Sequence, residues 1–192
     1  MKFKLLLILF SFTQLIFSQI KNEKEERIEV SEFPVKAQDI IKILPEECKH
    51  LKFYKETDGE KHSFEAKFKY KKQRYSLEFS TNGIIEDIEI TTKFKNIVNP
   101  IKDSIEAYFK NNFKKHKFIK IQKQYSYSQE TDSKQFLIDI MSQNTRTAPK
   151  FEIIAEVKTD KDRVIMEFTF NNDGAFLSSR ILNPASYEHV LY

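Results

Sequence analysis

The sequence predicts an α+β protein, built as a tandem repeat of one helix followed by a four-stranded antiparallel sheet. Three observations predict this fold class. An amphipathic helical stripe occurs twice beside a proline, and segments of alternating apolar and polar residues follow each stripe. Turn residues separate these segments, and the order of elements is the same in both copies. Because helices and sheets each bury one apolar face, we expect each helix to pack on its own sheet.

The first 18 residues are typical of a signal peptide. Lys2 and Lys4 precede an apolar run over 5–17, and Ser18 is a small residue suited to cleavage. The run is shorter than the roughly 20 residues that a membrane-spanning helix requires, so we expect no permanent membrane anchor. The chain is therefore expected to be exported, to the periplasm or outside the cell.

The first repeat is predicted over 30–95, after an exposed polar lead-in over 19–29. Pro34 opens a helix, and Pro45 ends it because the residue before a proline is pushed out of helical geometry. Asn82-Gly83 is a strong tight-turn pattern. Four strands are predicted from the alternation, over 51–56, 64–70, 75–79 and 84–90.

The second repeat is predicted over 96–192 and is more diverged. Asn99-Pro100 is a favourable helix start. An insertion around 128–149 contains alternating residues over 134–141, from which we expect an added strand or an extended hairpin, followed by a loop. The four strands of this repeat are predicted over 118–127, 151–158, 164–170 and 176–182.

Composition excludes several classes of protein. The formal net charge of +4 falls to +2 without Lys2 and Lys4, too little for a strongly basic nucleic-acid-binding domain. Cys48 is the single cysteine, so the chain makes no internal disulfide and depends on its apolar core. Eighteen phenylalanines and no tryptophan indicate a phenylalanine-rich core.

Catalytic and metal-binding patterns are sparse. Cys48 and His50 stand two residues apart, but nothing else marks a nucleophile. His62, His116 and His189 are scattered without metal-ligand spacing. Three glycines leave no room for a phosphate-binding loop. We therefore expect no enzyme, no cofactor and no metal site.

The sheet face that the helices leave free is the place where we expect binding. In the first repeat this face is polar and carries Lys52, Tyr54, Glu65, Lys67, Lys69, Ser76 and Glu78. In the second it carries apolar residues beside glutamates: Phe118, Leu137, Met141, Ile154 and Ile165 with Glu152, Glu156 and Glu167. Burial against the other half or the insertion would explain these apolar residues, and so would a partner surface. Glu86, Asp87 and Glu89 alternate with isoleucines, a pattern typical of an amphipathic edge strand.

The segment over 44–86 carries a family resemblance. Leu44-Pro45 ends a helix, an aromatic strand over 51–56 leads to Asp58-Gly59, and an alternating strand is followed by an apolar-Glu-Phe strand closed by Asn82-Gly83. This pattern resembles PepSY-like, β-lactamase-inhibitor-like proteins of bacterial envelopes, well over 34–90 and loosely over 99–182. The resemblance implies a tandem α+β fold in an exported protein without catalysis.

We expect an exported, non-enzymatic binding or inhibitor-like module that holds a protein or peptide of the cell envelope on a sheet face. The expected anchors are amphipathic aromatics and exposed aliphatics, namely Tyr54, Phe118, Tyr125, Tyr127, Ile154 and Ile165. One alternative is a carrier of a small ligand or lipid, which requires an apolar cavity. A less favoured alternative is a thiol enzyme that uses Cys48 and His50.

Overall fold

One ten-stranded mixed sheet dominates the computed structural model, which describes residues 19–160 and 162–183. The strand order is β1-β10-β9-β8-β7-β6-β5-β4-β3-β2. The strands are β1 (Gln19–Lys21), β2 (Glu23–Ile28), β3 (Lys49–Asp58), β4 (Lys61–Tyr70), β5 (Gln73–Ser80), β6 (Ile85–Thr91), β7 (Lys115–Ser126), β8 (Lys150–Lys158), β9 (Arg163–Phe170) and β10 (Phe176–Leu182). The α-helices are α1 (Val35–Ile41), α2 (Asn99–Asn112) and α3 (Ser133–Ser142). The predicted signal peptide lies outside the described residues.

The predicted fold class, a tandem repeat of one helix followed by a four-stranded sheet, is wrong. The eight predicted strands are present as β3 to β10, but they belong to one sheet because β6 pairs with β7 across the expected boundary between the repeats. The predicted lead-in also contributes β1 and β2 to this sheet. Strand pairing satisfies backbone groups that two separate sheets would leave exposed at their edges, and this explains the fusion.

The insertion forms the helix α3 rather than the expected strand or hairpin. The Asp132 side chain caps the helix by accepting a hydrogen bond from the Gln135 N–H at 2.9 Å. The buried residues of α3 follow a helical spacing, whereas Ile138, which the strand interpretation placed with them, is 49% exposed. The buried residues are Phe136, Leu137, Ile140 and Met141.

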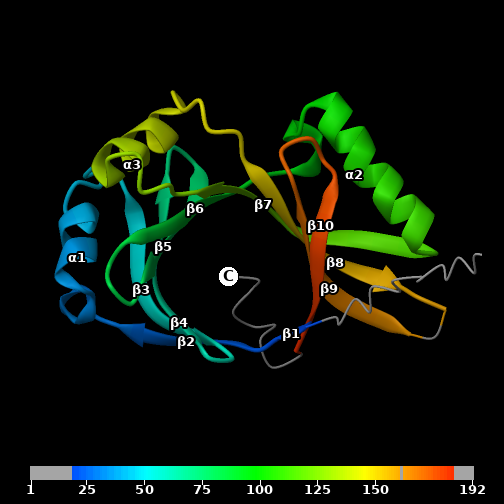
Figure 1. The fold of residues 1–192 in the computed structure, drawn as a ribbon, viewed down its shortest axis with the longest axis horizontal. Helices are drawn as coiled ribbons and strands as arrows, with labels where there is room; N and C mark the ends of the chain where they lie inside the picture. Colours follow the sequence, from blue (N-terminus) through cyan, green and yellow to red (C-terminus); the bar gives the residue numbers. More distant parts are fainter. Residues whose placement is uncertain (1–18, 161, 184–192) are drawn as a thin grey trace, which may run out of the picture.

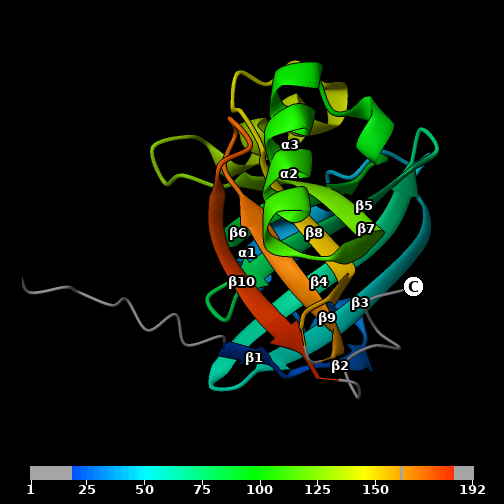
Figure 2. The ribbon, with the colours of Figure 1, turned by 90° about the vertical axis from the view of Figure 1, so that its right-hand side faces the viewer.

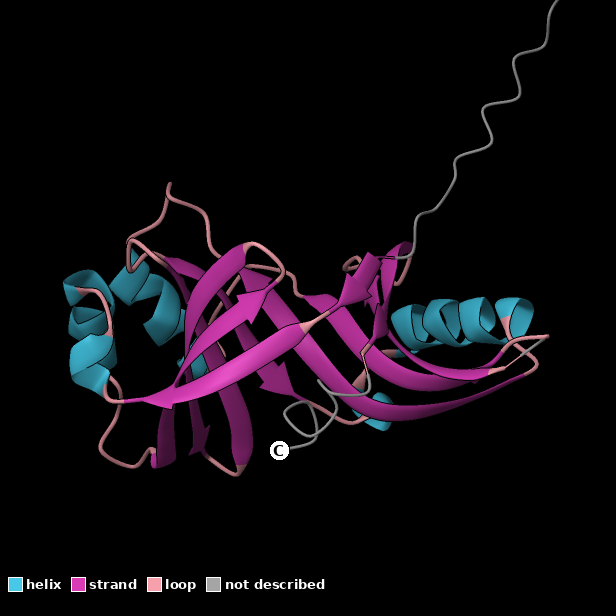
Figure 3. Ribbon diagram, turned by 90° about the horizontal axis from the view of Figure 1, so that it is seen from below, coloured by secondary structure: helices cyan, strands magenta, loops and turns pink. Residues whose placement is uncertain are grey.

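All three α-helices lie on the outer face of the curved sheet (Figure 1). They form two separate cores at opposite ends of the molecule (Figure 3). The first core lies between the sheet and α1 with α3, around Phe79, Leu77 and Ile140. The second lies beneath α2, which crosses the sheet in Figure 2, and centres on Phe109 and Phe168 with ring centroids 4.8 Å apart. The helices therefore leave the inner, concave face of the sheet to polar residues.

The two edges of the sheet meet because β1 and β2 are separated by Asn22 alone. β1 pairs in parallel with β10 at one edge, and β2 pairs antiparallel with β3 at the other (Figure 1). We call the side chains that join these edges the seam: Lys21, Asn22, Asp58, Glu167 and Arg180. The buried carboxylate of Glu167 accepts from Lys21 Nζ at 2.6 Å and from Arg180 Nη2 at 2.7 Å.

The other end of the seam is held by Asp58. Its Oδ2 accepts from Arg180 Nη1 at 2.6 Å, and its Oδ1 accepts from the Asn22 N–H at 3.0 Å. Arg180 therefore bridges β10 and β3, which belong to opposite edges of the sheet. Because Arg180 presents several donors in one plane, it bonds both carboxylates at the same time.

Two glycines let hairpin turns approach the start of a helix. Gly83 has φ +74°, and a Cβ there would lie 2.9 Å from the Ala37 nitrogen at the start of α1. Gly174 has φ +79°, and a Cβ there would lie 2.6 Å from the Ile101 carbonyl oxygen at the start of α2. Both positions therefore need glycine for conformation and for space.

We predict that Arg180→Ala lowers the free energy of unfolding by about 2–3 kcal/mol, since Glu167 stays buried with one cation fewer. Arg163→Ala is the matched control, because Arg163 pairs with Glu156 at the surface and its side chain is 60% exposed. That control is expected to change stability by less than about 1 kcal/mol. Urea unfolding measures the free energy of unfolding of both variants. Equal losses of stability would contradict the proposal that the seam stabilises the fold.

We predict that Gly174→Ala destabilises the protein more than Gly59→Ala. Gly59 also has a positive φ, +63°, but nothing lies within 4 Å of a Cβ built there. Both variants carry the strain of a left-handed conformation, about 1 kcal/mol, and only Gly174→Ala adds an overlap with backbone, about 1–3 kcal/mol more. Thermal unfolding measures the difference. The close approach to α2 is disproved if the two melting temperatures agree.

Candidate functional site

Charged side chains from most strands converge on the concave face, around a cavity of about 160 Å³. Its lining carries more carboxylates than cations. The carboxylates are Glu23, Glu25, Glu56, Asp58, Glu65, Glu78, Asp87, Glu89 and Glu152, and the cations are Lys21, Lys61, Lys67, Lys120 and Arg180. Strand alternation explains this division, because every second residue of β4 to β9 faces the helices and the intervening ones face inward.

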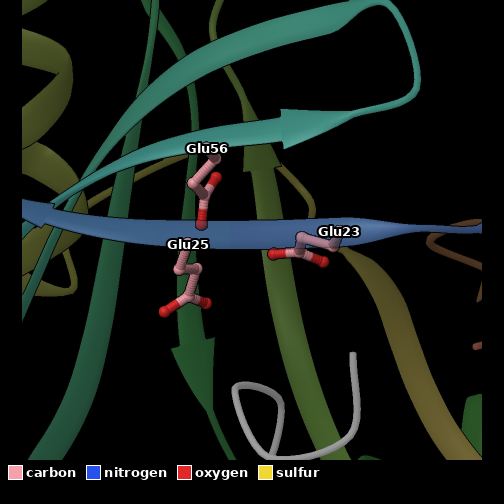
Figure 4. Close-up of side chains that lie close together, drawn as sticks. All are labelled: Glu23, Glu25 and Glu56. Atoms are coloured by element: carbon pink, nitrogen blue, oxygen red, sulfur yellow. The ribbon is translucent and has the colours of Figure 1, made fainter. Parts of the chain in front are cut away.

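One group of carboxylates in this cavity is neutralised by lysines. Glu23 and Glu25 of β2 lie close to Glu56 of β3 (Figure 4), with carboxylate oxygens within 4.8 Å of one another. Lys21 Nζ lies 2.7 Å from Glu23, and Lys67 Nζ lies 2.6 Å from Glu25. These ion pairs compensate the charge of the group.

In two pairs of neighbouring buried carboxyl groups, the pKa of one member is raised and that of the other is lowered. Burial and the neighbouring Glu65 raise the pKa of Glu56 well above its usual value. Burial also disfavours the charge of Glu65, but hydrogen bonds from Glu56 and Ser76 and the charge of Lys67 outweigh it and lower the Glu65 pKa. Glu56 therefore holds a proton more firmly than Glu65 does.

The second pair lies on β8 and β9. Burial and Glu167 raise the pKa of Glu152 to about 8. Burial opposes the ionisation of Glu167 too, but Lys21 and Arg180 outweigh it and lower the Glu167 pKa to about 2. The seam therefore keeps Glu167 charged while Glu152 holds the proton.

Three further acids, Glu78, Asp87 and Glu89, form no ion pair within 4.0 Å among the described residues. Glu65, Glu78 and Asp87 stand directly opposite one another on β4, β5 and β6, and Glu89 lies two residues beyond Asp87. The sequence pattern indicated an edge strand over 84–90, which is wrong: β6 lies between β5 and β7.

A second hollow, of about 670 Å³, opens on the same face toward β3, β4, β5 and β7. We call it the basic groove. Its lining combines cations with aromatic rings and contains two acids, Glu25 and Glu65, which both pair with Lys67. The other basic and aromatic residues of the lining are His50, Lys52, Lys69, Arg74, Lys93, Lys120, Tyr54, Phe68, Tyr75, Phe94 and Phe118.

The structure brings two of the six predicted anchors to this groove. Tyr54 lies on β3 with Lys67 Nζ 5.1 Å from its ring centroid. Phe118 lies on β7 with its ring 4.7 Å from that of Phe94. Both residues line the basic groove. Their role in binding stays a prediction.

The other four predicted anchors lie elsewhere. Tyr125 is 9% exposed in the core beneath α1 and α3. Tyr127 packs against the same core, and its hydroxyl donates to the Thr131 carbonyl at 2.6 Å. Ile154 and Ile165 form a small apolar cluster with Ile119 and Leu182. This cluster accounts for apolar residues on the inner face by burial within the chain.

Cys48 and His50 provide no support for a thiol enzyme. Burial, with a smaller contribution from Glu47, raises the pKa of the Cys48 thiol, and a raised pKa disfavours the nucleophilic thiolate. Cys48 packs against the core beneath α1. His50 lies on the exposed rim of the basic groove with φ 57°.

Sequence reasoning identified Glu65, Glu78, Glu152 and Glu167 as inward-facing but missed that they converge. Lys21, Glu23 and Glu25 were expected in an exposed lead-in. The sequence does show an acidic residue at an inward-facing position of several successive strands. It does not show that these residues lie close together, because that depends on the curvature of the sheet.

Comparisons with known proteins show similarity of fold. A DUF2874 family protein from Bacteroides ovatus covers 78% of this chain and 87% of its own, with 9% identity and a TM-score of 0.52. A proposed periplasmic protein from Bacteroides eggerthii covers 78% and 88%, with 9% identity and a TM-score of 0.51. A BLIP-like protein from Bacteroides fragilis covers 76% and 84%, with 13% identity and a TM-score of 0.47.

The sequence searches find no relatives. No protein-family model matches the chain, and a search of curated proteins finds no match. At 9% identity, the likeness to the first two structures concerns the fold alone, and the PepSY-like, β-lactamase-inhibitor-like relationship stays a prediction. Within the described part of the chain, no helix is both long and apolar enough to cross a membrane.

We predict that the free energy of unfolding falls as the pH rises from about 5 to about 8. Glu152, with a pKa of about 8, and Asp87, with a pKa of about 6, bind protons in the folded state that the unfolded chain has released. The folded state therefore binds more protons across this range, and stability declines with rising pH, by up to about 5 kcal/mol. Below about pH 4, the free energy of unfolding falls as the pH is lowered further, because Glu167 with its lowered pKa becomes protonated.

Urea unfolding in EDTA-containing buffers at several pH values measures this dependence. Glu152→Gln removes one of the titrating groups and should flatten the decline between pH 6 and 8. If the urea concentration at the unfolding midpoint of the unsubstituted protein rises between pH 5 and 8, the raised pKa values assigned to these carboxyl groups are contradicted.

Proposed function

We propose that the protein is an exported, non-enzymatic binding module whose basic groove holds an acidic segment of a polypeptide. The observation that favours this function most directly is a pair of like charges. Lys69 on β4 and Arg74 on β5 stand directly opposite each other, both exposed and both lining the groove. Like charges opposite each other destabilise a sheet, so an anionic partner would relieve a repulsion that the fold itself retains.

The remaining charges of the groove act in the same direction. Lys52 and Lys93 are exposed there, and neither they nor Lys69 or Arg74 forms an ion pair within the described residues. Unpaired cations attract an acidic segment over a distance of about 8 Å at physiological ionic strength. They would therefore accelerate the association and fix its orientation.

Aromatic rings supply the apolar part of the groove. Tyr54 is half-buried beside the cations, and Phe118 packs with Phe94 at the opposite side. Rigid aromatic side chains contribute contact area with little loss of conformational entropy. An extended segment with alternating acidic and apolar side chains matches these two features.

The alternatives receive less support. A lipid carrier needs an apolar cavity, but the inner cavity is lined by charged residues and the cores beneath the helices are filled by aromatic side chains.

Export is supported by the predicted signal peptide and by similarity in fold to the proposed periplasmic protein from Bacteroides eggerthii.

We predict that the protein binds a fluorescent peptide that alternates glutamate with tyrosine, and that the double variant Lys69→Ala/Arg74→Ala binds it at least tenfold more weakly. A loss of that size corresponds to about 1.4 kcal/mol. Because the double variant removes a repulsion, it should be at least as stable as the unsubstituted protein. Fluorescence anisotropy measures the affinity, which should also fall as the salt concentration rises.

The matched control removes two lysines from the outer face. Lys36 is exposed on α1 and Lys134 is exposed on α3, so Lys36→Ala/Lys134→Ala produces the same change in net charge. A peptide with lysine in place of glutamate tests the sign of the charge. The proposed function fails if the acidic peptide does not bind, or if both double variants weaken its binding equally.

A further inference from the structure

Three carboxylates of the inner cavity form a compact group at the centre of the sheet. Glu78 of β5 and Asp87 and Glu89 of β6 present oxygens that lie within 4.8 Å of one another. Calcium binds oxygen ligands at 2.3–2.6 Å, so oxygens around one ion are separated by no more than about 5 Å. The spacing of the group therefore suits one ion between the three carboxylates.

Asp87 carries an oxygen with no partner. Four buried carboxylate oxygens in the described residues lack a hydrogen bond: Glu23 Oε2, Glu65 Oε2, Glu86 Oε2 and Asp87 Oδ1. The first three lie 2.7, 3.0 and 2.7 Å from Lys21, Lys67 and Lys61. Asp87 Oδ1 has no hydrogen bond, and no lysine or arginine nitrogen lies within 4.0 Å of it among the described residues. A buried oxygen without a partner is costly, so a cation or a hydrogen-bond donor beside it would stabilise the folded state.

The charge of this group is not compensated by ion pairs. Among the described residues, no lysine or arginine nitrogen lies within 4.0 Å of Glu78, Asp87 or Glu89. In the neighbouring acidic group of Glu23, Glu25 and Glu56, which Figure 4 shows, Lys21 pairs with Glu23 and Lys67 pairs with Glu25. Two acidic groups in one cavity therefore differ in how their charge is neutralised.

Without a cation, the three carboxylates resist ionisation. Burial, together with Glu86 and Glu65, raises the pKa of Asp87 to about 6 despite the nearby Lys61. Burial and the facing Asp87 raise the pKa of Glu78 well above its usual value, and burial with Glu152 does the same for Glu89. A positive ion would reverse this destabilisation.

Two amide side chains hold the group in place. Gln124 Nε2 donates to Asp87 Oδ2 at 3.1 Å, and Gln122 Nε2 donates to a Glu89 oxygen. Each amide donates to one oxygen of its carboxylate, and the second oxygen is not engaged by that amide. Such outer contacts orient the ligands in metal sites.

We infer that Glu78, Asp87 and Glu89 bind one Ca²⁺ ion inside the concave face. The donor set contains carboxylates and no thiol or imidazole, which favours a hard cation over zinc. The cavity of about 160 Å³ leaves room for water molecules to complete the coordination. This site is distinct from the basic groove, so it does not depend on the proposed peptide binding.

Isothermal titration of the EDTA-stripped protein with CaCl₂ at pH 7.5 tests the inference. We expect one Ca²⁺ per chain, with a dissociation constant of about 10⁻⁴–10⁻³ M or lower, and a rise in melting temperature at saturating Ca²⁺. Asp87→Asn and Glu78→Gln keep the size of each side chain and remove one charged ligand, so each should weaken binding at least tenfold.

Glu56→Gln is the matched control. Glu56 belongs to the other acidic group and lies outside the proposed ligands, and its raised pKa favours the neutral form that an amide resembles, so Ca²⁺ affinity should stay within about twofold. Asp87→Asn should be at least as stable as the unsubstituted protein without Ca²⁺, because it removes a repulsion, so weaker binding cannot be attributed to misfolding. If either ligand variant fails to fold, the other decides.

Three results would overturn the site: no heat of binding up to about 10 mM CaCl₂, unchanged affinity in Asp87→Asn and Glu78→Gln, or an equal loss in Glu56→Gln. The last result would indicate attraction to the acidic cavity as a whole.

Discussion

The carboxylate of Glu167, held between Lys21 and Arg180, is the interaction on which the rest of the structure depends. It joins the strand at one edge of the sheet to β10 and, through Arg180 and Asp58, to the strand pair at the other edge. Closing the edges gives the sheet its curvature, and the curvature brings inward-facing side chains of distant strands together. A flat sheet of the same strands would separate those side chains and expose both edges.

The resulting concave face carries negative and positive side chains in two different areas. Carboxylates gather around the cavity near the seam, and cations gather in the basic groove between β3, β5 and β7. In both places like charges stand opposite each other on neighbouring strands, as Glu78 and Asp87 do at one end and Lys69 and Arg74 at the other. Such pairs reduce stability, and proteins retain groups of this kind mainly at functional sites. The outer face has no such conflict, because phenylalanine and isoleucine pack there beneath the helices.

The candidate site could be predicted from the sequence only in part. Alternation identified seven residues of the free face, and all but Glu78 line the basic groove: Lys52, Tyr54, Glu65, Lys67, Lys69, Ser76 and Glu78. The same pattern does not show how far apart two inward residues lie when they come from strands separated along the chain. Glu25 and Lys67, 42 residues apart, form an ion pair that no local pattern contains. The sequence placed Asp87 in an edge strand. In the structure this strand lies inside the sheet, because β6 pairs with β7, and local alternation does not show that pairing.

Local patterns in the sequence determined the helices α1 and α2, the eight strands from β3 to β10 and, except in β7 with its irregular register, the faces that their side chains occupy, because these depend on periodicity and turn residues. The tertiary structure decided three things. Burial of Phe136 and Ile140 made α3 a helix, pairing of β6 with β7 joined two expected sheets into one, and the seam recruited the polar segment over 19–28 as edge strands. Each of these outcomes depends on contacts between residues far apart in the chain, whose energies no local pattern records.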